Sequence, residues 1–157
     1  MNENQFKLST KLVCTRNVRE YRETVPLWVD ENDVVLEIGC EWGTTTQVLV
    51  RYCRSVIGTD VSPKCIQRAE EKHPQLDFRV LDGFDVRAAL ALGRQFTKIY
   101  IDISGLSGYR SLLDTIALLN AYATIFQPKA IVVKSGALKR FASNCIVWKS
   151  GPVSGQG

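Results

Sequence analysis

Short apolar segments alternate with segments of helical spacing from residue 34 onward. The apolar segments are rich in valine and isoleucine, and continuous runs of this length are typical of strands that are buried on both faces of a sheet. Five such strands are predicted, at residues 34–38, 55–59, 78–81, 98–103 and 130–134.

The segments between these strands carry helical signals. Thr44 and Gln47 have the spacing of a capping box, and Ser62 before Pro63 is typical of a helix N-cap. Other helices are predicted around Val86, over residues 109–126 and, ahead of the first strand, over 18–29. Strands that alternate with helices predict an α/β fold, in which a doubly wound, mostly parallel sheet has helices on both faces.

A chain of 157 residues is long enough for one domain with a single core. We expect residues 1–149 to form that domain and the Gly-, Ser- and Pro-rich segment 150–157 to be a disordered tail. No apolar run reaches the length of a membrane span, and the chain begins with a polar segment, so neither a membrane span nor a secretory signal is expected.

Five cysteines and one histidine limit the redox and metal chemistry. The cysteines are odd in number and scattered, with no C-x-x-C pair, so we expect no metal site and no disulfide framework. Reduced cysteines predict an intracellular protein, which we place in the cytoplasm.

The net charge of +4 is unevenly distributed, because no acidic residue follows Asp114. The basic residues of that C-terminal third are Lys129, Lys134, Lys139, Arg140 and Lys149. This segment predicts an anionic partner such as RNA, although a solvated surface with few carboxylates explains it equally well. The sequence gives no indication of oligomeric state.

An acidic residue recurs at or beside the carboxyl ends of four predicted strands. These residues are Glu37, Asp60, Asp82 and Asp102, which follow one another at intervals of 20 to 23 residues. Ligands bind to parallel sheets at the carboxyl ends of the strands, so we expect the four carboxyl groups to share one edge. Clustered carboxylates are costly unless they bind something, and they therefore indicate a ligand that offers hydrogen-bond donors or positive charge.

Each group at this edge has a role available. The glycines after the first strand let the backbone turn sharply and approach a ligand. Asp60 is placed to accept hydrogen bonds from the hydroxyls of a ribose. Asp82 has an oxygen for an adenine amino group, and Phe84 offers the ring an apolar surface. Glu37 lies beside the loop that would hold an ammonium group.

The segment VVLEIGCEWGTTT resembles the E-x-G-x-x-x-G first motif of class I S-adenosylmethionine-dependent methyltransferases. VIGTDVSPKCIQRAEEK is similar to their second motif and FRVLDGFDV to their third, in the same order and at matching spacing. The resemblance implies a Rossmann-like fold and S-adenosylmethionine as cofactor. It assigns the cofactor site to Glu37, Gly39, Gly43, Asp60, Asp82, Gly83 and Phe84.

The sequence departs from this family in two places. The middle glycine of the first loop is Glu41, followed by the bulky Trp42. The family's sheet ends with antiparallel sixth and seventh strands, whereas only residues 145–149 resemble a strand after Lys134, so we expect a truncated C-terminal edge. A nicotinamide-dinucleotide domain is the weaker alternative, because its G-x-G-x-x-G fingerprint is absent and Asp82 would have no task.

Asp102 and Lys134 are the candidate catalytic residues, because both end strands that we expect to be neighbours. The surrounding segments resemble fibrillarin-like RNA 2′-O-methyltransferases, which pair an Asp and a Lys at these two positions. A further lysine of that family has no clear counterpart; Arg22 and Lys11 are the nearest cations. The alternative to a catalytic pair is that Lys134 is a surface lysine and Asp102 serves only at the cofactor side. Two functions follow: an active methyltransferase acting on RNA or another anionic acceptor, or a cofactor-binding, catalytically degenerate domain with a regulatory or interaction role.

Overall fold

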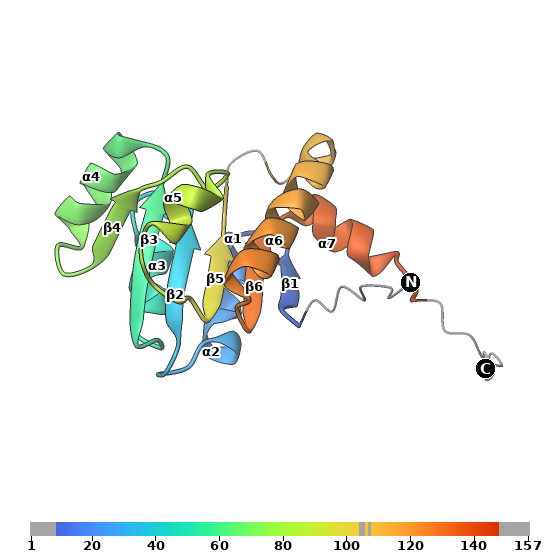
Figure 1. Cartoon of the computed structure of the whole chain (residues 1–157), viewed down its shortest axis with the longest axis horizontal. Helices are drawn as coiled ribbons and strands as arrows, with labels where there is room; N and C mark the ends of the chain where they lie inside the picture. The colour runs from blue at the N-terminus through green and yellow to red at the C-terminus, as the bar shows by residue number, and fades with distance from the viewer. Residues whose placement is uncertain (1–8, 104–105, 107, 148–157) are drawn as a thin grey trace.

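Six parallel strands form one sheet in the computed structural model, which describes residues 9–103, 106 and 108–147. The strand order is β1-β6-β5-β2-β3-β4, with helices on both faces of the sheet (Figure 1). The strands are β1 (Lys11–Thr15), β2 (Val34–Ile38), β3 (Ser55–Asp60), β4 (Asp77–Val80), β5 (Lys98–Ile101) and β6 (Ala130–Lys134). All five predicted strands are confirmed, and β5 ends two residues earlier than expected.

The sequence did not predict β1. This strand pairs in parallel with β6, from Lys11 opposite Ala130 to Thr15 opposite Lys134, and so forms the edge of the sheet. The strand expected at 145–149 is wrong over 145–147, which are neither helix nor strand, and 148–149 lie outside the described residues. The edge that we expected to be truncated at its C-terminal end is therefore covered by an N-terminal strand.

Seven α-helices are described, and a 3-10 turn (Tyr109–Ser111) precedes the sixth. They are α1 (Val18–Glu23), α2 (Val25–Trp28), α3 (Thr44–Leu49), α4 (Pro63–Lys72), α5 (Val86–Leu90), α6 (Leu112–Phe126) and α7 (Gly136–Ser143). The helix predicted over 18–29 is divided at Thr24, because Pro26, in the first turn of α2, has no N–H with which to continue the hydrogen bonds of α1.

The helix starts show which sequence signals were correct. Ser62 caps α4 as predicted, since its hydroxyl accepts a hydrogen bond from the Cys65 N–H. The capping box at Thr44 is wrong, because the N-cap of α3 is Gly43, in the left-handed conformation with φ 77°. Gly43 accepts the first helical hydrogen bond from the Gln47 N–H, so Thr44 already lies inside the helix.

Two apolar layers hold the helices against the sheet. On one face, Ile38, Ile101 and Val133 pack in the cluster that contains Tyr122 and Phe126 of α6. The other face buries a second cluster beneath the first three helices, made of Tyr21, Val25, Val29, Val35, Leu49, Val56, Tyr100 and Val132. Each fully buried side chain of this size contributes about 1.5–3 kcal/mol to folding, so burial on both faces fixes the sheet between the helices.

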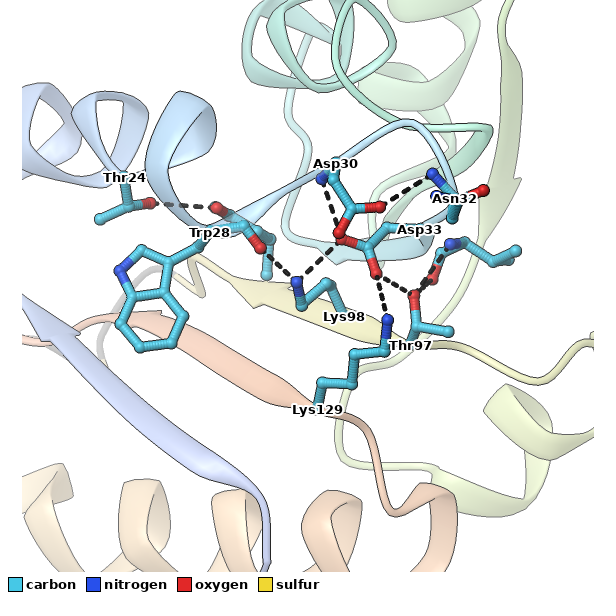
Figure 2. A network of polar contacts seen from close by, with 10 residues as sticks. Thr24, Trp28, Asp30, Asn32, Asp33, Thr97, Lys98 and Lys129 are labelled. Atoms are coloured by element: carbon cyan, nitrogen blue, oxygen red, sulfur yellow. Dashed lines mark hydrogen bonds and ion pairs between the residues drawn. The ribbon is translucent and has the colours of Figure 1, made fainter.

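A buried ion pair joins the amino ends of the strands (Figure 2). The Lys98 ammonium lies 2.8 Å from Asp33 Oδ2 and also donates to the Trp28 carbonyl oxygen, while the Thr97 hydroxyl donates to Asp33 Oδ1 at 2.7 Å. Burial acts to raise the pKa of Asp33, but these hydrogen bonds outweigh it and lower that pKa. The network stabilises the edge opposite the one where the sequence places a ligand.

None of the described helices has both the length and the apolar character that a membrane span needs. The tail predicted for residues 150–157 lies outside the described residues.

Candidate active site

A cavity of about 520 Å³ lies at the carboxyl ends of the strands. Its walls come from the loops that follow β2, β3, β4 and β5 and from the end of β6. The lining residues are Ile38, Gly39, Glu41, Asp60, Val61, Cys65, Leu81, Asp82, Gly83, Phe84, Asp102, Ile103 and Lys134. Three of the four predicted strand-end carboxylates, those of Asp60, Asp82 and Asp102, thus share one cavity.

Gly39 allows the first loop to lie directly against the end of β5. Its φ is +85°, and a Cβ atom at this position would lie 1.9 Å from the Asp102 carbonyl oxygen. The N–H groups of Gly39 and Cys40 both donate to the Thr59 carbonyl oxygen, at 2.7 and 2.8 Å. The glycine is therefore required for the close approach of backbone to backbone that forms this wall.

Gly43, the second glycine of the motif, does not line the cavity. Its φ is +77°, and a Cβ atom there would lie 2.6 Å from the ring of Phe78. In the structure, its lack of a side chain lets the start of α3 pack against Phe78 of β4.

Glu41 occupies the position where the family often has a glycine. It has a φ of +50°, a left-handed conformation that side chains adopt at a cost. Its N–H donates to Asp60 Oδ2 at 3.1 Å, so this strained residue also helps to orient the neighbouring carboxylate.

Asp60 is held by hydrogen bonds to both of its oxygens. Oδ2 accepts from the Glu41 N–H, and Oδ1 accepts from the Ser62 N–H at 2.9 Å. Two backbone donors fix the plane of the carboxylate and leave its remaining lone pairs toward the cavity that the residue lines. The group is thereby preorganised to accept hydrogen bonds from a ligand.

The loop after β4 supplies a carboxylate and an aromatic ring. Asp82 Oδ1 accepts from the Phe84 N–H at 2.9 Å, and the Phe84 side chain is 51% exposed at the wall of the cavity. Between them, Gly83 packs so tightly that a Cβ would lie 2.5 Å from Ile38, and its carbonyl oxygen accepts from the Tyr122 hydroxyl. The residues predicted from the third motif therefore lie together on one wall.

Glu37 lies apart from the cavity, unlike the other three acidic residues. It is only 1% exposed, and its Oε2 accepts a hydrogen bond of 2.5 Å from the Thr46 hydroxyl of α3. Burial raises the pKa of its carboxyl group to about 8, against the lowering effect of that hydrogen bond. The role that we expected for Glu37, facing a ligand's ammonium group, finds no support in this position.

Asp102 and Lys134 form an ion pair at the ends of the adjacent strands β5 and β6. Both side chains are partly buried, with 18% of Asp102 and 24% of Lys134 exposed, and both line the cavity. The structure thus brings together the two residues that the sequence singled out. In such a pair the carboxylate can accept a proton, and the ammonium group can balance a developing negative charge.

Neither cation suggested as the family's further lysine reaches this pair. The Arg22 guanidinium donates to the Thr45 hydroxyl of α3 at 3.0 Å. Lys11 begins β1 beside Ala130, at the amino end of the sheet. Neither residue lines the cavity.

Sequence reasoning missed the apolar and thiol groups of the cavity wall. Val61, Leu81 and Ile103 follow the ends of β3, β4 and β5, and Cys65 comes from the first turn of α4. Leu81 and Ile103 are the last residues of two predicted strands, and Val61 lies two residues beyond a third, so closeness to a strand end was the signal that would have identified them. Among the described residues, no group of three His, Cys, Asp or Glu side chains is arranged to hold a metal ion.

The basic residues of the C-terminal third do not form one surface in the described part of the chain. Lys129 lies 3.7 Å from Asp33 at the amino edge, Lys139 lies 2.7 Å from Glu20, and Lys134 is paired in the cavity. Three of the five predicted cations are therefore each paired with a carboxylate, and an anionic partner stays a prediction.

Comparisons with known proteins agree with this geometry. Residues 35–117 match the model of a family described as a methyltransferase domain. No curated protein matches the chain.

Solved structures of other proteins share the fold. DesVI of Streptomyces venezuelae is 19% identical, with a TM-score of 0.58 over 74% of this chain and 48% of that one. The sugar N-methyltransferase KedS8 of Streptoalloteichus sp. ATCC 53650 is 21% identical, with a TM-score of 0.54 over 74% and 44%. A dimethyladenosine transferase of Plasmodium falciparum is 19% identical, with a TM-score of 0.50 over 70% and 38%. The chain thus spans less than half the length of each.

Proposed function

The chain belongs to the methyltransferase-domain family of Rossmann-like, S-adenosylmethionine-dependent enzymes, and we propose that it methylates an oxygen or nitrogen nucleophile in the cavity at the carboxyl edge of its sheet. The observation that carries this proposal is the placement of Asp60, Asp82 and the Asp102–Lys134 pair around one cavity. A cofactor end and an acceptor end can then face each other across a short distance.

The residues present fit S-adenosylmethionine. Asp60 offers oriented carboxylate oxygens to ribose hydroxyls, and Asp82 offers an acceptor beside the exposed ring of Phe84, which suits an adenine. Gly39 lets the first loop lie directly against the backbone of Asp102, which brings the cofactor wall of the cavity up to the Asp102–Lys134 pair. When bound, the cofactor supplies a methyl group activated by its positively charged sulfur.

Asp102 and Lys134 provide the chemistry at the acceptor end. A hydroxyl or amine that enters the cavity can donate to a carboxylate oxygen of Asp102, which then receives the proton that the nucleophile loses. The Lys134 ammonium, which is paired with this carboxylate, stabilises negative charge that develops on an oxygen nucleophile. Methyl transfer depends chiefly on position, so an acid–base pair fixed by two adjacent strands is a suitable device.

RNA or another anionic molecule is our proposed acceptor. The net charge of +4 and the cation at the acceptor end of the cavity support it. The second candidate function is cofactor binding without turnover. It is favoured by Glu41, a residue with a side chain whose backbone has the left-handed conformation in the cofactor loop.

A transfer assay separates these candidates. The full chain is incubated with S-adenosylmethionine labelled in its methyl group and with either a randomised RNA 20-mer or glucosamine. We expect label in the RNA and not in glucosamine, which carries no negative charge. We also expect a loss of kcat of about 100-fold or more for Lys134→Met with cofactor affinity retained, and full activity for the control Lys139→Met. Cofactor binding without transfer to either acceptor would favour the degenerate domain, and an active Lys134→Met would remove the pair from the mechanism.

A further inference from the structure

A second hollow of about 560 Å³, which we call the α4 groove, adjoins the cavity. It is lined by Trp42, Ser62, Lys64, Cys65, Gln67, Arg68 and Glu71. Cys65 lines both hollows, so the groove meets the cavity beside the loop that carries Asp60. In Figure 1 the helix α4 lies at the end of the molecule that carries β4, far from the N-terminal strand β1.

Trp42 gives the groove an aromatic surface. The residue is 37% exposed although it directly precedes a buried glycine. The guanidinium of Arg68 and the ammonium of Lys72 each lie 4.7 Å from the centre of its ring. Cations at this distance interact favourably with the ring, and together they hold an indole at the surface.

Three cations form a row on α4, and two of them, Lys64 and Arg68, line the groove. Lys64, Arg68 and Lys72 follow one another at intervals of four residues, so they share one face of α4 and succeed each other about 6 Å apart along its axis. All three are exposed, and none forms an ion pair within the described part of the chain. The acidic residue of the groove, Glu71, accepts a hydrogen bond from Gln67.

This arrangement differs from that of the C-terminal cations. Lys129, Lys134 and Lys139 each lie within 4 Å of a carboxylate. The cations on α4 have no carboxylate partner among the described residues, and two of them lie against the uncharged ring of Trp42. A single phosphate needs one or two such cations. A row of three beside an aromatic ring is complementary to a chain of phosphates that carries flat bases.

We propose that the α4 groove docks single-stranded nucleic acid, with Trp42 stacking on a base and the row Lys64, Arg68 and Lys72 contacting successive phosphates. Stacking on an aromatic side chain is available to every base, and phosphate contacts are independent of sequence, so this docking has little sequence preference. The proposal deepens the proposed function, since it supplies a surface for an RNA acceptor, but it is a statement about binding and does not require turnover.

The test measures binding of a fluorescein-labelled 12-nucleotide oligouridylate by anisotropy, at several salt concentrations. Lys64→Glu/Arg68→Glu reverses two cations of the row, and Trp42→Ala removes the ring. The matched control is Arg51→Glu/Arg54→Glu, which makes the same change of net charge on two exposed arginines outside the groove. Each variant is also titrated with S-adenosylmethionine, so that a failure of the cofactor site is recognised separately.

We expect the wild type to bind with a logarithmic salt slope of about −2, which corresponds to three phosphates of a single strand. The groove double variant should lose more than tenfold in affinity and Trp42→Ala about tenfold, while the arginine control stays within about threefold of the wild type. Uridine monophosphate should compete at least 100-fold less well than the oligomer. No binding by the wild type at low salt, equal losses in both double variants, or equal competition by the mononucleotide would each overturn the proposal.

Discussion

Glu37 shows at the scale of one residue how the environment changes a carboxyl group's role. The sequence placed it at the ligand edge with the other acidic residues, but the side chains of a strand alternate between its two faces. Glu37 lies on the face covered by the first three helices, where it is buried against Thr46. Its position beside the loop was predictable, and its burial beneath α3 was not.

Glu37 should make stability depend on pH in an unusual direction. Its folded pKa of about 8 lies above the ordinary value of 4.5, so between these values the folded state holds a proton that the unfolded state releases. The free energy of unfolding should therefore fall as pH rises from about 4.5 to 8, by up to about 1.4 kcal/mol per pH unit. Urea unfolding should show that Glu37→Gln abolishes this fall, and parallel pH profiles for the two proteins would contradict it.

Glu41 provides a second test at the residue scale. Its φ of +50° costs a side chain about 1 kcal/mol or more, a cost that glycine avoids. We expect Glu41→Gly to raise the free energy of unfolding by about 1 kcal/mol, measured by urea unfolding. The control Glu41→Ala removes the same carboxylate but keeps a Cβ atom, so it should bring no comparable gain. Equal effects of the two substitutions would show that the charge of Glu41, and not its backbone strain, determines the change in the free energy of unfolding.

Among the elements, β1 and α7 escaped prediction for physical reasons. The segment KLVCT is half-exposed at the edge of the sheet and so lacks the continuous apolar run of a central strand. In α7 only Ala137 and Leu138 are buried, too few for a helical pattern to be visible. The central strands β2, β5 and β6 were predictable because their side chains are buried on both faces, which restricts them to apolar residues.

The pairing of β1 with β6 gives a prediction at this scale. The Lys11 N–H donates to Lys129 at 3.1 Å, and since donors alternate along a strand, the Val13 N–H also faces β6 while that of Leu12 faces away. Val13→Pro should therefore lower the free energy of unfolding by about 1–3 kcal/mol more than Leu12→Pro. Chemical unfolding measures both, and equal losses would show that this ladder contributes nothing specific.

The buried ion pair between Asp33 and Lys98, at the amino edge of the sheet, gives a second prediction at the scale of elements. Lys98→Met leaves the Asp33 carboxylate buried without its closest cation, which should cost about 3–5 kcal/mol. Lys129 approaches the same carboxylate at 3.7 Å but is 63% exposed, so Lys129→Met should change stability by less than about 1 kcal/mol. Thermal or urea unfolding that gave both variants the same stability would refute the role assigned to this network.

For the whole molecule, the sequence predicted the functional edge of the sheet better than its outer boundary. Asp60, Asp82 and Asp102 lie at or just beyond the ends of β3, β4 and β5, and parallel strands bring their carboxyl ends to one edge. The groove on α4 could not be foreseen, because it depends on how the helix lies against the loop that carries Trp42. Pairing of the C-terminal cations with Asp33 and Glu20 was likewise invisible, since these partners are far away in sequence.

The central claim is that the cavity at the carboxyl edge binds S-adenosylmethionine through Asp60. Calorimetric titration of the full chain with this cofactor tests it most directly, with Asp60→Ala as the site variant and Asp30→Ala, at the opposite edge, as the matched control. We predict micromolar binding by the wild type and the control, weakened at least tenfold in Asp60→Ala. A well-folded wild type that does not bind, or an Asp60→Ala variant that binds equally well, would contradict the account.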